Sequence, residues 1–143
     1  TATGASALVM KKFLNKNSRI LTYDIIPWKK YPFCGLKEND FDNRLQQIIG
    51  DLSDNAFNET QKDLFKSADL IFIDAGKDGV MEKKFCNFLD TVPFNKPPIV
   101  IFDDIKMYQM IKLWEEIKYP KLDITSFGHW SGTGLVLWDC KQN

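Results

Sequence analysis

Leu70-Ile71-Phe72-Ile73-Asp74 and Pro97-Pro98-Ile99-Val100-Ile101-Phe102-Asp103-Asp104 are the two stretches that decide the fold. Each is an almost wholly apolar run that ends on acidic residues, and such runs are typical of strands in a sheet covered on both faces. Between them, Asp78 to Leu89 carries apolar residues at helical spacing. This alternation of strand and helix predicts an α/β fold with a parallel sheet.

The same alternation continues along the chain in both directions. The further elements are predicted helices over 5–14, 54–66 and 107–117, predicted strands over 19–24 and 45–51, and a closing antiparallel hairpin of 122–127 and 133–138. Residues 27–40 are rich in aromatic residues and are predicted to form a loop or broken helix near the site. Because single domains commonly have ~100–150 residues, we expect 1–143 to be one domain, a three-layer α/β sandwich with a mainly parallel sheet.

The composition limits the classes of partner. Lys and Arg together number 19, as do Asp and Glu, so the net charge is zero, whereas duplex-binding surfaces usually carry a basic excess. No apolar run approaches the ~18–20 residues that cross a bilayer. Cys34, Cys86 and Cys140 form no metal-binding spacing, and an odd count favours a reducing compartment. We therefore expect a cytoplasmic protein without nucleic-acid or membrane partners.

Aspartates recur where the predicted strands end. They are Asp24, Asp51, Asp74 and the pair Asp103-Asp104. In open parallel sheets ligands lie across the carboxyl ends of the strands, so this edge is the predicted site. A carboxylate in the position of Asp24 can accept both hydroxyls of a ribose, although an aspartate that only solubilises a loop is the alternative.

The small-residue turn Thr1-Ala2-Thr3-Gly4-Ala5-Ser6 opens the first predicted helix. Such a turn lets a ligand approach backbone N–H groups at the helix N-terminus. The alternative is a plain helix cap made by the side chain of Thr3 or Ser6.

The order of these segments resembles that of class I S-adenosylmethionine-dependent methyltransferases, and within them the small O-methyltransferase-like group. The segments are Thr3-Gly4-Ala5-Ser6, Asp24, Ile49-Gly50-Asp51-Leu52, Phe72-Ile73-Asp74, Ile101-Phe102-Asp103-Asp104 and Gly132-Thr133-Gly134-Leu135-Val136. The resemblance implies a Rossmann-like fold, S-adenosylmethionine as cofactor, and methyl transfer to a small-molecule acceptor at oxygen. The glycine-rich motif of that family begins on a first central strand, and this sequence starts after it.

The resemblance also implies roles for individual residues. Gly4, Ala5 and Ser6 would line the methionine part of the cofactor, Asp24 would bind the ribose, Gly50, Asp51 and Leu52 would flank the adenine, and Asp74 would close the pocket near the sulfonium. In the metal-dependent members of the catechol type, an Asp and an Asp-Asn pair hold a divalent ion. By that likeness Asp74, Asp103 and Asp104 would hold Mg²⁺ and Lys77 would deprotonate the acceptor, with Asp104 standing where the family has Asn.

Two further groups are candidates for the site. His129 is the only histidine and could act as a general base, although a lone histidine in a turn is more commonly a surface residue. Trp28, Tyr31 and Phe33 could form a lid over the acceptor, or could pack locally.

Two alternative functions stay open. Thr3-Gly4-Ala5-Ser6, Asp51-Leu52-Ser53-Asp54, Asp74-Ala75-Gly76 and the pair Tyr108 and Lys112 resemble fragments of a short-chain dehydrogenase that uses NAD(P). On a helix, Tyr108 and Lys112 would also be an ordinary i, i+4 surface pair. The second alternative is a non-catalytic Rossmann-like binding domain.

The apparent absence of the first strand leads to a prediction about the sheet. We expect the strands that end at Asp24 and Asp74 to pair directly in a six-stranded sheet, because unpaired backbone groups cost stability when buried. The alternative is that a segment of another chain fills the gap, and a homo-oligomer is one such possibility. We also expect weak or absent binding of S-adenosylmethionine by this chain, restored by an upstream extension of roughly 20–40 residues.

Overall fold

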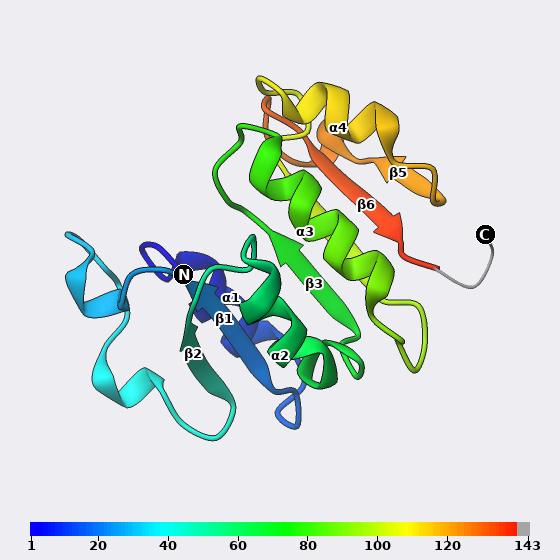
Figure 1. Ribbon diagram of the computed structural model, residues 1–143. Helices are drawn as coiled ribbons and strands as arrows, with labels where there is room; N and C mark the ends of the chain where they lie inside the picture. Colours follow the sequence, from blue (N-terminus) through cyan, green and yellow to red (C-terminus); the bar gives the residue numbers. More distant parts are fainter. Residues whose placement is uncertain (140–143) are drawn as a thin grey trace. The chain divides into compact units, whose positions relative to one another are not determined.

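The computed structural model describes residues 1–139, so Cys140 lies outside the described part (Figure 1). It is an α/β structure in which helices alternate with strands, as the sequence predicts. The chain divides into two compact units, one of residues 1–57 and one that begins at Asn58. Within residues 1–139, no helix is long and apolar enough to cross a membrane.

The first unit is a parallel strand pair with one helix. Its elements are α1 (Ala5–Phe13), β1 (Ile20–Asp24), the 3-10 turns η1 (Trp28–Lys30) and η2 (Glu38–Asp40), and β2 (Leu45–Ile49). β1 and β2 pair in register from Ile20 opposite Leu45 to Asp24 opposite Ile49. Ala7 of α1 and Leu36 of the connection complete a small apolar cluster with Ile20 and Leu45.

The second unit holds a four-stranded mixed sheet. Its elements are the end of α2 (Asn55–Phe65), β3 (Leu70–Ile73), α3 (Val80–Thr91), β4 (Ile99–Asp103), α4 (Met110–Glu116), β5 (Lys121–Asp123), the 3-10 turn η3 (Thr125–Phe127) and β6 (Thr133–Leu137). The strand order is β3-β4-β6-β5. β3 and β4 are parallel, whereas β6 is antiparallel to both β4 and β5.

The core of the second unit lies on one face of this sheet. Along β4, Val100 and Phe102 are buried while Ile99, Ile101 and Asp103 are more exposed, which is the period-2 pattern of a strand. α3 lies over the sheet in Figure 1 and carries buried Phe85, Phe88 and Leu89. Phe65 of α2 makes edge contacts with Phe85 and Phe88. Each such buried side chain contributes about 1.5–3 kcal/mol.

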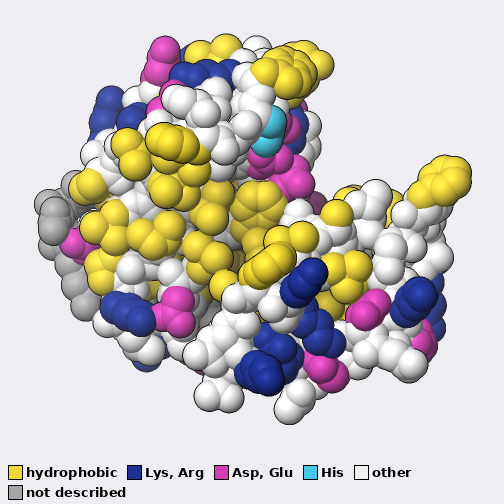
Figure 2. All heavy atoms as spheres, turned by 180° about the vertical axis from the view of Figure 1, so that it is seen from behind, with side chains coloured by type: hydrophobic (Ala, Val, Ile, Leu, Met, Phe, Trp, Pro, Cys, Tyr) yellow, Lys and Arg dark blue, Asp and Glu magenta, His cyan; other side chains and the backbone are white. Residues whose placement is uncertain are grey.

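The sequence predicts a sheet covered on both faces, but the other face of this sheet is partly exposed. Leu70, Ile99 and Leu137 lie side by side in the register of β3, β4 and β6. Their side chains are 37%, 38% and 40% exposed. The apolar run therefore reflects one deeply buried face and one partly exposed apolar face. Figure 2 shows that hydrophobic side chains gather on the side of the molecule turned away in Figure 1.

The predicted six-stranded sheet is wrong. Among residues 1–139, β1 pairs with β2 alone and β3 with β4 alone, in two separate sheets. The prediction assumed that unpaired edge groups must find each other, but that cost applies only where water is excluded. The sheets are also less parallel than predicted, since two of their four strand pairings are antiparallel.

Two predicted elements are shorter than their sequence patterns. The helix predicted from Met107 begins at Met110, because Tyr108, inside the predicted range, has φ of 46°, outside the helical region. Tyr108 therefore precedes α4, and the predicted helical pair with Lys112 is wrong. The hairpin strand predicted over 122–127 ends at Asp123, and a 3-10 turn follows it.

Candidate functional site

The carboxyl ends of β3 and β4 carry a cluster of charged residues. Ile73 lies opposite Phe102, so Asp74 and Asp103 follow at the same edge of the sheet. Lys77, in the turn after β3, reaches back to this edge. Its Nζ lies 2.8 Å from Asp74 Oδ1, 2.9 Å from Asp104 Oδ2 and 3.8 Å from Asp103 Oδ2. The structure thus brings together the predicted catalytic pair Lys77 and Asp74 with the predicted metal ligands.

A buried glutamate holds the turn that carries Lys77. Glu82 is fully buried in the first turn of α3, where its Oε1 accepts the Lys77 N–H at 2.7 Å and its Oε2 accepts the Gly79 N–H at 3.0 Å. Lys77 itself has φ of 65°, a conformation that non-glycine residues rarely adopt. Such strain persists only where surrounding contacts enforce it, and Glu82 provides two of them.

His129 and Ser131 complete the cluster from the turn before β6. His129 Nε2 lies 2.8 Å from Asp103 Oδ1, and Nδ1 lies 2.5 Å from Ser131 Oγ. Ser131 Oγ also donates to Asp104 Oδ1. A hydroxyl has one hydrogen, so when Ser131 Oγ donates to Asp104 it can only accept from His129 Nδ1. Because Ser131 is buried and engaged by Asp104, this chain of contacts does not present a nucleophile.

The charges of the cluster stabilise one another. Burial favours a lower pKa for Lys77, but hydrogen bonds and charge from Asp74 and Asp104 outweigh it and raise the pKa of Lys77 above its usual range. Burial favours a higher pKa for Asp104, but hydrogen bonds from Ser131 and Lys77 lower it. In this arrangement Lys77 is therefore an ammonium ion, and a role as base requires it to lose these carboxylate contacts.

The side chains that could together hold a metal ion differ in one residue from the predicted ligands: His129 takes the place of Asp74. Ligand atoms of Asp103, Asp104 and His129 lie within 4.8 Å of one another. Asp74, the third predicted ligand, is instead engaged by Lys77 and its side chain is 47% exposed. The histidine was only a secondary candidate in the sequence, because its approach to Asp103 depends on the antiparallel register of β4 and β6. Figure 2 shows the histidine (cyan) beside acidic side chains at the surface.

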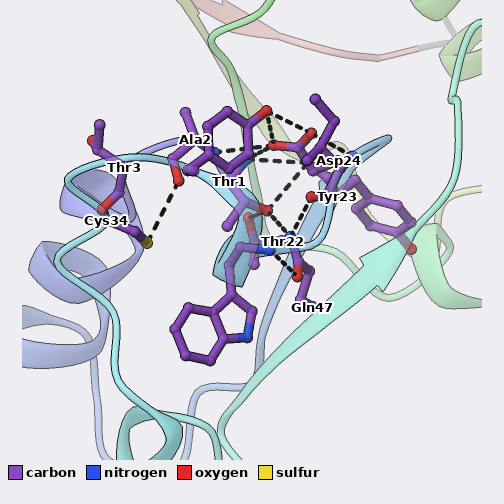
Figure 3. A network of polar contacts seen from close by, with 11 residues as sticks. Thr1, Ala2, Thr3, Thr22, Tyr23, Asp24, Cys34 and Gln47 are labelled. Atoms are coloured by element: carbon purple, nitrogen blue, oxygen red, sulfur yellow. Dashed lines mark hydrogen bonds and ion pairs between the residues drawn. The ribbon is translucent and has the colours of Figure 1, made fainter.

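In the first unit, Asp24 lies at the end of β1 and binds the turn that opens α1 (Figure 3). Its Oδ2 accepts the Ala2 N–H at 3.0 Å and its Oδ1 accepts the Ile26 N–H at 3.0 Å. The hydroxyl of Tyr31 lies 2.9 Å from Oδ1 and 3.1 Å from Oδ2. Burial favours a higher pKa, but these donors outweigh it and lower the pKa of Asp24 to about 2.

The turn itself depends on glycine. Gly4 caps α1 with φ of 82°, and a Cβ on it would lie 2.3 Å from Leu36 Cγ. No side chain caps α1, so the alternative in which Thr3 or Ser6 does so is wrong. Ala5 and Ser6 are exposed in the first turn of α1. Gly4, the third predicted residue of this turn, is buried, and its N–H donates to the Thr1 carbonyl at 2.9 Å.

The segment after β2 joins the same edge. The Gly50 N–H donates to the Asp24 carbonyl at 2.9 Å. A Cβ on Gly50 would lie 2.1 Å from Phe57 Cζ, so the glycine allows an aromatic ring to lie against the backbone. Asp51 is exposed and its Oδ1 accepts the Ser53 N–H at 2.8 Å, while Leu52 is partly buried. The structure thus brings Gly50 to Asp24, whereas the Asp51 carboxylate closes its own local turn.

The three aromatic residues proposed as a lid have different surroundings. Trp28 stacks on Phe41 with ring centroids 5.2 Å apart, which is the local packing alternative. Tyr31 contacts Asp24, and Phe33 is 97% exposed with φ of 62°. Only Tyr31 among them contacts a predicted site residue in the described contacts.

Comparison with known proteins does not assign the chain to a family. No family model matches the sequence, and no curated protein matches it.

The buried contacts of Glu82 predict a stability effect. In Glu82→Gln, one amide oxygen replaces two carboxylate acceptors, and the amide NH₂ then faces a backbone N–H. We expect a loss of about 1–3 kcal/mol in the free energy of unfolding, measured by urea denaturation. Glu59→Gln on α2, whose carboxylate is largely exposed, should change it by less than about 0.5 kcal/mol. Equal effects of the two substitutions would contradict the role of Glu82.

The lowered pKa of Asp24 predicts an acid-dependent loss of stability. Because the folded state favours the carboxylate, this contribution is present above about pH 4 and is lost as the pH falls toward the folded-state pKa of about 2. As the pH falls over this range, the free energy of unfolding of wild-type protein should therefore decrease by about 1–2 kcal/mol more than that of Asp24→Asn. Urea denaturation at each pH measures both values. Tyr31→Phe, which removes one donor, should lose an intermediate amount. Parallel pH profiles for wild type and Asp24→Asn would contradict the assignment.

Proposed function

We propose that this chain is a Rossmann-like methyltransferase domain that uses S-adenosylmethionine to methylate a small-molecule acceptor at oxygen. The observation that carries the proposal is Asp24. It lies at the carboxyl end of a parallel strand, and the Ala2 N–H of the turn before α1 donates to it at 3.0 Å. A carboxylate beside a helix-opening turn suits a ribose, with the rest of the cofactor along the turn.

The surroundings of Asp24 support a nucleoside over a simple sugar. Phe57 lies against the backbone at Gly50, which itself bonds to the Asp24 carbonyl. Ligand sites of this class combine apolar walls with a few placed polar groups, and the combination fits an adenine with its ribose. An NAD(P) cofactor shares this chemistry, so the dehydrogenase alternative is distinguished by the ligand rather than by the geometry.

Taken by itself, the cluster of the second unit carries groups of the kind that methyl transfer to oxygen uses. An acceptor hydroxyl must lose its proton, and its developing charge must be stabilised. Asp103, Asp104 and Asp74 or His129 are the residues that would hold a divalent ion such as Mg²⁺, and carboxylate oxygens are the ligands that Mg²⁺ prefers. A divalent ion bound there would lower the pKa of an acceptor hydroxyl. Lys77, once its carboxylate partners are otherwise engaged, is the group placed to take that proton.

Ligand titration tests the proposed cofactor. Isothermal titration of the chain with S-adenosylhomocysteine, at protein and ligand concentrations high enough for weak binding, should show binding, and Asp24→Ala should weaken it by about 1–3 kcal/mol because ligand hydroxyls lose their acceptor. Asp63→Ala, an exposed acid on α2, is the matched control and should bind like wild type. Affinity unchanged in Asp24→Ala would remove Asp24 from the site. Binding of NAD instead of S-adenosylhomocysteine would favour the dehydrogenase alternative. If neither ligand binds, the result would favour the non-catalytic alternative.

Lys77 provides a test of the divalent ion. Its ammonium neutralises the carboxylates that would bind the ion, so Lys77→Met should bind Mn²⁺, used as a spectroscopic substitute for Mg²⁺, at least roughly tenfold more tightly than wild type. Free Mn²⁺ is measured by electron paramagnetic resonance. Adding Asp104→Asn to Lys77→Met should reverse the gain. Absence of Mn²⁺ binding in all three proteins would remove the metal from the proposed mechanism while leaving methyl transfer untouched.

A further inference from the structure

The connection between β1 and β2, residues 25–44, places one of its own side chains on the candidate ribose ligand. Tyr31 lies in this connection, and its hydroxyl spans both oxygens of the Asp24 carboxylate, at 2.9 Å and 3.1 Å. The phenol thus lies where two neighbouring hydroxyls of a ribose would bind a carboxylate.

The Asp24 carboxylate has no acceptor position left for a further hydrogen-bond donor. A carboxylate has about four acceptor positions. The Ala2 N–H takes one position on Oδ2 and the Ile26 N–H takes one on Oδ1, each at 3.0 Å, and the Tyr31 hydroxyl lies across the two positions that remain. A hydroxyl that approaches either oxygen must therefore displace Tyr31, because the other donors belong to the backbone.

The connection is anchored on both sides of Tyr31. Before it, the Trp28 N–H donates to Gln47 Oε1 at 3.0 Å and its ring stacks on Phe41. After it, the Gly35 N–H donates to the Thr3 carbonyl at 2.8 Å. Between these anchors Phe33 is 97% exposed, so this part of the connection has room to move without disturbing the anchors.

We propose that Tyr31 is an autoinhibitory latch, whose hydroxyl occupies the place of ligand hydroxyls on Asp24 and must leave before a nucleoside binds. This inference rests on the proposed function, because it assumes that Asp24 binds a ribose. The exchange is favourable for a diol, since two ligand hydrogens replace the single hydrogen of the phenol. It is unfavourable for a ligand with one hydroxyl, so the latch selects for a diol. Burial and the hydrogen bond to Asp24 also raise the pKa of Tyr31, which keeps the phenol a donor.

The experiment compares Tyr31→Phe with a matched variant of the same chemistry. Tyr119 donates to Asp90 at 2.7 Å in the second unit, so Tyr119→Phe removes an equivalent hydrogen bond away from Asp24. In isothermal titration with S-adenosylhomocysteine, Tyr31→Phe should bind roughly three- to tenfold more tightly than wild type, because no internal donor has to leave. Tyr119→Phe should bind like wild type.

A second measurement needs no ligand. Lys29 and Lys30 directly precede Tyr31, so trypsin cleavage at these lysines reports how firmly the connection is held. Without ligand, Tyr31→Phe should be cleaved there several-fold faster than wild type and Tyr119→Phe. Equal cleavage rates would show that the latch is not closed in solution and would overturn the proposal.

The titration also separates this inference from the proposed function. Weaker binding by Tyr31→Phe would mean that Tyr31 contacts the ligand. Unchanged binding would mean that Tyr31 does not compete with the ligand. Either result would overturn the latch and leave the proposed function standing. No binding by wild type, Tyr31→Phe or Tyr119→Phe would overturn the proposed function and the latch with it.

Discussion

The in-register pairing of β3 with β4 is the constraint on which the candidate catalytic cluster depends. Ile73 lies opposite Phe102, and both side chains are buried on the same face of the sheet. A shift of one residue would turn each buried side chain to the other face, so the hydrophobic core fixes the register. Asp74 and Asp103 follow the fixed pair directly. Their proximity is therefore a consequence of core packing and does not rely on attraction between like charges.

The types of secondary-structure element, and the sheet edge that carries the candidate site, could be predicted from the sequence because both follow from local patterns. Asp24, Asp74 and Asp103 were identified from strand ends alone, and the structure has each there. Glu82 was missed, although a glutamate three residues after the N-cap Gly79 is placed to accept the N–H groups at the start of a helix, a signal that could have found it.

Other features had no local signal. The contact of His129 with Asp103 joins residues 26 apart and depends on the pairing of β4 with β6. The late start of α4 follows from the backbone at Tyr108, which apolar periodicity does not encode. Likewise, the six-stranded sheet was predicted from the cost of unpaired strand edges, a cost that disappears where water reaches the edge.

Both clusters share one physical property: their carboxylates are already satisfied by the chain itself. Asp24 accepts from Tyr31 and the backbone, and Asp104 from Lys77 and Ser131. A ligand at either place exchanges with an internal donor, so its affinity is the difference between two sets of contacts. Such exchange lowers affinity but sharpens selection, because a ligand that brings fewer donors or less charge than it displaces cannot bind. The internal donors also keep these partly buried acids paired without ligand, which protects the fold from the cost of unmet carboxylates.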